Sequence, residues 1–72
     1  MNTIEKLHKI LKSLENDSKN GNKEDIDYIT YDYPYFIYLC KEMIGFLSGS
    51  EDCMQFSYTD ISMFIMNHAF RL

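Results

Sequence analysis

Residues Tyr28–Tyr38, YITYDYPYFIY, contain five tyrosines and a phenylalanine around the only proline of the chain. Proline is tolerated in the first turn of a helix, where its missing N–H donor is not needed. Pro34 therefore predicts the start of a helix. The residue before a proline avoids helical backbone angles, so we expect a turn at Asp32–Tyr33. The helix should end at about Ser48, because Gly49 is a natural helix stop.

The preceding segment, Glu24–Tyr33, fits two local structures. As a helix it begins with acidic residues at the positive end of the helix dipole, after a cap at Asn22. As a strand it is rich in aromatic and β-branched residues, although neither face is cleanly apolar. We favour the helix, which gives a compact all-α domain of three or four helices. The alternative is a small α+β domain in which two short strands, Asp25–Tyr31 and Asp52–Tyr58, pair.

The first fifteen residues predict an amphipathic helix, capped by Asn2 or Thr3. Its apolar residues recur at spacings of three and four, which is typical of one buried helix face. They are Ile4, Leu7, Ile10, Leu11 and Leu14. Residues 16–23, NDSKNGNK, contain no apolar side chain, and Asn20-Gly21 is a turn signal. We therefore predict one domain over residues 1–72 with a polar loop at about 16–23.

A last helix is predicted from Tyr58 to about Phe70, because Ser57 and Asp60 resemble a capping box with Asp in place of Glu or Gln. One apolar stripe comprises Ile61, Phe64, Ile65, Ala69 and Leu72, and a second comprises Met63, Met66 and Phe70. A helix that is apolar nearly all round is normally buried on every side. A 72-residue chain has too few elements to surround it, so the second stripe predicts contact with another protein chain. The alternative is that Met63 and Met66 are simply exposed.

The tyrosine cluster allows three interpretations. The rings can cover a small core, form a protein-binding face, or stack on bases. Stacking is the least favoured, because no basic groove accompanies the tyrosines. The candidate partner-binding residues are Tyr31, Tyr35, Tyr38, Met63, Met66 and Phe70.

Catalytic and metal-binding motifs are not apparent in the sequence. Cys40, Cys53, His8 and His68 show no spacing typical of a zinc site, so we predict no metal and no cofactor. Both cysteines are expected to be reduced and buried, with a Cys40–Cys53 disulfide as the alternative. Cys40 lies on an apolar helix face, where a thiol is inert. Arg71 is expected to complement the negative end of the last helix. We therefore predict that the protein is not an enzyme.

The composition of the chain argues against nucleic acid as a direct partner and against a location in the membrane. The formal net charge is −4 and only one arginine is present, which disfavours direct binding of nucleic acid. No signal peptide is apparent, and no apolar run approaches about 18 residues, so we expect no membrane span. We predict a cytoplasmic protein, in the host cell's cytoplasm if the gene is viral.

Amino-acid usage suggests a source. Phe, Tyr, Met, Ile, Asn and Lys, which have A/T-rich codons, account for 35 of the 72 residues, whereas Gly, Ala, Arg and Pro account for six. The predicted function is a small acidic protein-binding module that also self-associates, an accessory protein of a phage or mobile element that inhibits or modulates a host protein. The alternatives are an oligomeric nucleotide binder, with Lys or Arg71 at the phosphate, and a structural subunit of a larger assembly.

Overall fold

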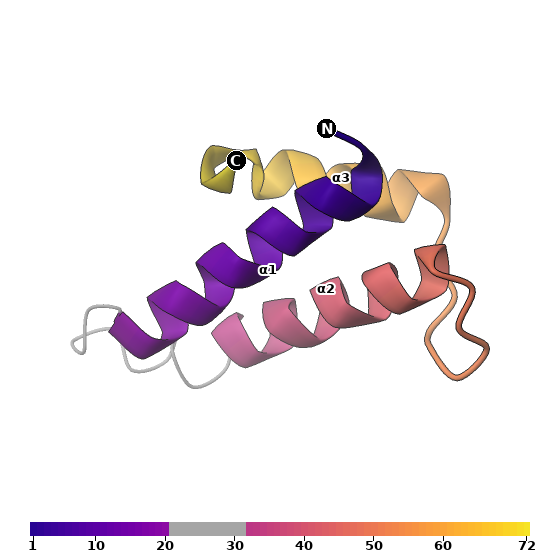
Figure 1. The fold of residues 1–72 in the computed structure, drawn as a ribbon, viewed down its shortest axis with the longest axis horizontal. Coiled ribbons are helices and arrows are strands. Elements are labelled where there is room, and N and C mark those ends of the chain that lie inside the picture. Colours follow the sequence, from indigo (N-terminus) through magenta and orange to yellow (C-terminus); the bar gives the residue numbers. More distant parts are fainter. Residues whose placement is uncertain (21–31) are drawn as a thin grey trace.

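The computed structural model describes residues 1–20 and 32–72, and this part of the chain is all α, as predicted. It contains α1 (Thr3–Asn20), α2 (Tyr33–Leu47), α3 (Tyr58–Asn67) and a 3₁₀ turn, η2 (Ala69–Arg71). Helices α1 and α2 lie side by side and antiparallel, and α3 crosses α1 (Figure 1). Residues 52–57 form no strand, so the α+β alternative is wrong for that segment. Its other strand, Asp25–Tyr31, lies outside the described residues.

Helix α1 is longer than the sequence pattern predicts. It begins as expected, with the Asn2 side chain accepting a hydrogen bond from the Glu5 N–H at 2.9 Å. It continues to Asn20, so the prediction of a loop is wrong for residues 16–20, and residues 21–23 of that loop lie outside the described residues. Two contacts stabilise the extra turns. Asn20 Nδ2 donates to Asn16 Oδ1 at 3.0 Å, and Asp17 pairs with Arg71 of η2.

Helix α2 ends where Gly49 predicts, but the turn predicted at Asp32–Tyr33 is wrong. Tyr33 is the first residue of the helix, and Asp32 already has helical backbone angles of φ −75° and ψ −46°. Pro34 lies in its first turn, and Gly49 has a positive φ of 88° just past its end. The Gly49 N–H donates to the Phe46 carbonyl at 3.2 Å and the Ser50 N–H donates to the Gly45 carbonyl at 2.9 Å. These are the two hydrogen bonds of a Schellman motif, which favours glycine at the left-handed position.

Helix α3 has the predicted capping box. The Asp60 N–H donates to Ser57 Oγ at 3.1 Å, and the Ser57 N–H donates to Asp60 Oδ2 at 3.0 Å. The hydrogen bond from the Ser57 N–H, together with the Ser57 side chain, lowers the pKa of the Asp60 carboxyl. The predicted end at Phe70 is wrong, because the α-helix stops at Asn67 and the chain turns through His68 into η2. The tighter turn directs Arg71 back to α1.

All three helices contribute to one small core. The buried apolar residues are Leu7, Ile10, Leu14, Cys40, Met43, Ile61 and Phe64. The Cys40 thiol also donates a hydrogen bond to the Leu7 carbonyl at 3.1 Å, which joins α2 to α1. Both cysteines are free thiols, as predicted, and the alternative Cys40–Cys53 disulfide is not formed. Cys40 is buried as predicted, whereas Cys53 is only half-buried and the prediction of its burial is wrong.

Candidate functional site

An exposed apolar row follows the outer side of α3 into η2. We call Met63, Met66 and Phe70 the α3 ridge; they are 57%, 73% and 75% exposed. The two methionines lie on the side of α3 opposite buried Ile61 and Phe64. The two apolar stripes of the sequence therefore differ in burial. Ile61, Phe64 and Ile65 of the first stripe contribute to the core, whereas its last two members, Ala69 and Leu72, are exposed. The second stripe is open to solvent.

The predicted tyrosine face is only partly described. Tyr31 lies outside the described residues, while Tyr35 and Tyr38 are exposed on the side of α2 that faces away from Cys40. A hydrogen bond to Glu42 raises the pKa of the Tyr38 hydroxyl. Tyr33 differs from both, because its ring packs against the core. The exposed tyrosines and the α3 ridge are therefore surfaces on two different helices.

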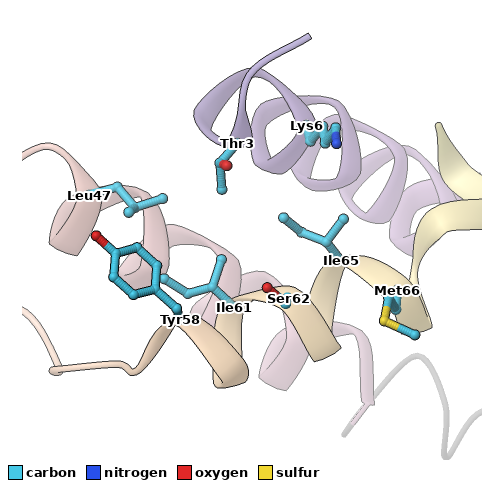
Figure 2. Close-up of a pocket in the computed structure, with 8 residues that line it drawn as sticks. All are labelled: Thr3, Lys6, Leu47, Tyr58, Ile61, Ser62, Ile65 and Met66. Carbon is cyan, nitrogen blue, oxygen red and sulfur yellow. The ribbon is translucent and has the colours of Figure 1, made fainter.

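A groove lies on the side of α3 that faces α1. We call this cavity of about 290 Å³ the Lys6 groove (Figure 2). Its apolar floor is Leu47, Ile61 and Ile65, its polar groups are Thr3, Lys6 and Ser62, and Tyr58 and Met66 complete the lining. Thr3 and Lys6 come from the start of α1 and Ile65 points toward them from α3 (Figure 2). No carboxylate lines this groove.

A second groove of about 390 Å³ lies on the other side of α3. We call it the Met54 groove, and Met43, Met54, Phe56 and Met63 are among its lining residues. Met63 of the α3 ridge thus borders the Met54 groove, and Met66 borders the Lys6 groove. The outer side of α3 is therefore a raised apolar row with a hollow along each side.

A cluster around Arg71 was not predicted from the sequence. Its Nη1 donates to Ser13 Oγ at 3.0 Å and forms an ion pair with Asp17. The guanidinium also lies 4.9 Å from the centroid of the Phe70 ring. The Arg71 side chain is only 4% exposed and the Asp17 side chain is 42% exposed. Arg71 therefore fixes η2 to α1 and is not placed to meet the phosphate of a bound nucleotide.

His68 is buried beside this cluster in an aromatic setting. Its ring centroid lies 4.8 Å from that of Phe36 and 4.5 Å from that of Phe64. Nδ1 has no hydrogen-bond partner among the described residues. Burial, together with the charge of Arg71, lowers the pKa of the imidazole, so the neutral form is favoured.

The buried environment of His68 predicts that acid destabilises the folded protein. In the unfolded chain His68 binds a proton with a pKa of about 6.5, whereas the folded protein binds that proton less readily. The free energy of unfolding is therefore highest above the pKa of the unfolded chain. It decreases as the pH falls below that pKa, by no more than about 1.4 kcal/mol per pH unit. Urea unfolding between pH 7 and pH 5 should show this slope in wild type and in the exposed-site control His8→Gln. His68→Gln should flatten it, and an unchanged slope would contradict the assignment.

The remaining titratable and metal-ligating side chains of the described residues bear on the requirements of a reactive thiol and of a metal site. Burial raises the pKa of the Cys40 thiol to about 12, so this cysteine is protonated at neutral pH. Within residues 1–20 and 32–72, no three His, Cys, Asp or Glu side chains are grouped to hold a metal ion. None of the described helices combines the length and apolar character needed to cross a membrane. Comparison with models of known families, with curated proteins and with solved structures finds no significant match.

Proposed function

We propose that this chain acts by binding another protein through the α3 ridge. The observation that carries the proposal is the exposure of Met63, Met66 and Phe70 in one row. Methionine and aromatic side chains are enriched at protein interfaces, where they fill pockets on a partner. The hollows on each side of α3 would let side chains of the partner pack beside the ridge.

The charge of the ridge defines the kind of partner surface. Asp60 is the only charged residue of α3, and its carboxylate is already bound within the capping box. The side chains of the ridge themselves carry no charge, although Asp60 is exposed at the start of α3 and the chain as a whole carries a net charge of −4. The complementary surface is therefore apolar and uncharged. A second copy of the chain presents such a surface, so the proposal includes self-association.

The biological setting of the proposal rests on the sequence. Small size, acidity and A/T-rich codon usage favour an accessory protein of a phage or mobile element. Its task would be to inhibit or modulate a host protein in the host cell's cytoplasm. Tyr35 and Tyr38 would add a second contact surface on α2.

Charge introduced into the ridge should weaken binding of a partner and leave the fold intact. Met63→Glu and Met66→Glu each place an unpaired carboxylate in an apolar interface, so we expect affinity for a partner to fall about tenfold or more. Both positions are exposed, so the free energy of unfolding should change by no more than about 0.5 kcal/mol. Capture from native host lysate with purified wild type and variants measures the effect.

The controls separate the ridge from other surfaces. His8→Glu introduces the same side chain at an exposed position of α1 and should leave capture unchanged. Tyr38→Glu tests whether the α2 tyrosines contribute to capture of the partner. Light scattering over a hundredfold concentration range should show an oligomer that Met63→Glu dissociates if the partner is a second copy. Equal capture and equal mass for wild type and both ridge variants would refute the proposal.

A further inference from the structure

We propose that the Lys6 groove binds a small amphipathic carboxylate, with the anionic head at Lys6 and the apolar body on the floor of the groove. The inference does not rest on the proposed protein binding. It comes from the composition of the groove, which combines an apolar floor of Leu47, Ile61 and Ile65 with one cation and two hydroxyls.

Two of the three polar groups of the groove, including its cation, come from α1. Thr3 and Lys6 both belong to the first two turns of that helix, and Ser62 lies on α3 between the two floor isoleucines (Figure 2). Lys6 forms no ion pair with any residue in the described part of the chain. An unpaired ammonium and two hydroxyls, with no carboxylate in the lining, suit an anion and not a cation.

The size of the groove limits the ligand. A cavity of about 290 Å³ corresponds to roughly ten water molecules at about 30 Å³ each. This volume suits a ligand of about ten non-hydrogen atoms, such as a medium-chain carboxylate. A nucleotide is too large, and it would need more cationic groups than the single lysine provides.

Octanoate is a suitable probe, with octanamide as its neutral analogue of the same shape. In an amide NMR titration we expect saturable shifts at Thr3, Lys6, Ile61 and Ile65, with a dissociation constant in the micromolar-to-millimolar range. Octanamide should bind about fivefold more weakly at low salt, because an accessible ion pair contributes little more than this. Added salt should reduce the difference between the two ligands.

Matched variants test the two halves of the site. Lys6→Gln should weaken octanoate binding about fivefold, whereas Lys9→Gln, an exposed neighbour outside the groove, should not. Ser62→Leu fills the hollow and should abolish the saturable shifts. Thr59→Leu also replaces a hydroxyl residue with leucine, at an exposed α3 position that does not line the groove, and should leave the shifts unchanged.

Three outcomes would overturn the proposal. They are shifts that do not saturate, equal affinity for octanoate and octanamide, or equal behaviour of Ser62→Leu and Thr59→Leu. Met63→Glu separates this site from the ridge, because Met63 does not line the Lys6 groove. Octanoate binding should survive in that variant, so loss of protein binding and loss of ligand binding are distinguishable.

Discussion

Replacing Asp17 with alanine is expected to destabilise the protein more than replacing Arg71 with methionine, although the two residues form one ion pair. The Arg71 side chain is 4% exposed and its Nε has no hydrogen-bond partner among the described residues. Without Asp17 its charge stays buried and uncompensated, which costs about 3 kcal/mol. Removing Arg71 instead leaves Asp17 at the surface, 42% exposed, where water replaces its partner. Methionine also retains much of the packing of the arginine stem, so this loss should be about 1 kcal/mol.

Urea unfolding followed by circular dichroism measures both losses. Glu15→Ala, at an exposed acidic position of the same helix, is the matched control and should change the free energy of unfolding by no more than about 0.5 kcal/mol. The double variant should resemble Arg71→Met alone, because Asp17 has no buried charge to compensate once the guanidinium is gone. A smaller loss for Asp17→Ala than for Arg71→Met would show that the guanidinium is solvated when unpaired.

The same ion pair explains why the end of α1 could not be predicted from local sequence. Residues 16–20 are polar and contain good turn formers, so their intrinsic preference is for a loop. They are helical where Asp17 meets Arg71, a residue 54 positions later. A contact of this range leaves no local signal. Asp17 follows Leu7, Ile10 and Leu14 at helical spacing, which places it one turn beyond the buried residues on the same side of α1.

Local signals were sufficient elsewhere. Gly49 ends α2, and Ser57 with Asp60 starts α3, because each acts through hydrogen bonds within a few residues of itself. Pro34 acts locally too, through the fixed backbone angle that suits the first turn of α2. Spacing also places Ile61 and Phe64 on one stripe of the last helix and Met63 and Met66 on another, but it does not predict that Ala69 and Leu72 of the first stripe are exposed.

The candidate sites depend on more than spacing. The sequence could not show that Tyr33 packs on the core while Tyr35 and Tyr38 do not, because the rotation of α2 about its axis decides this. The Lys6 groove could not be predicted from the sequence either, because its lining comes from three helices and depends on how these helices pack.

The largest loss of stability is expected from Phe64→Ala. The Phe64 ring is 7% exposed and packs against the buried core and His68. Truncating a buried phenylalanine typically costs about 3–5 kcal/mol, because apolar contacts are lost and a cavity remains. A chain of this length is stable by roughly 4–10 kcal/mol, so the variant should be partly unfolded at 37 °C.

Phe70→Ala makes the same exchange six residues later at a side chain that is 75% exposed. Its ring covers one face of the Arg71 guanidinium, so we expect a small loss, about 0.5–1 kcal/mol, and not a neutral change. The two phenylalanines thus separate stability from binding: Phe64→Ala should lower the midpoint of urea unfolding sharply, while Phe70→Ala should lower it slightly and weaken partner capture. If Phe70→Ala were as destabilising as Phe64→Ala, the ridge would be part of the core of an obligate oligomer, and unfolding of the wild type would then depend on protein concentration.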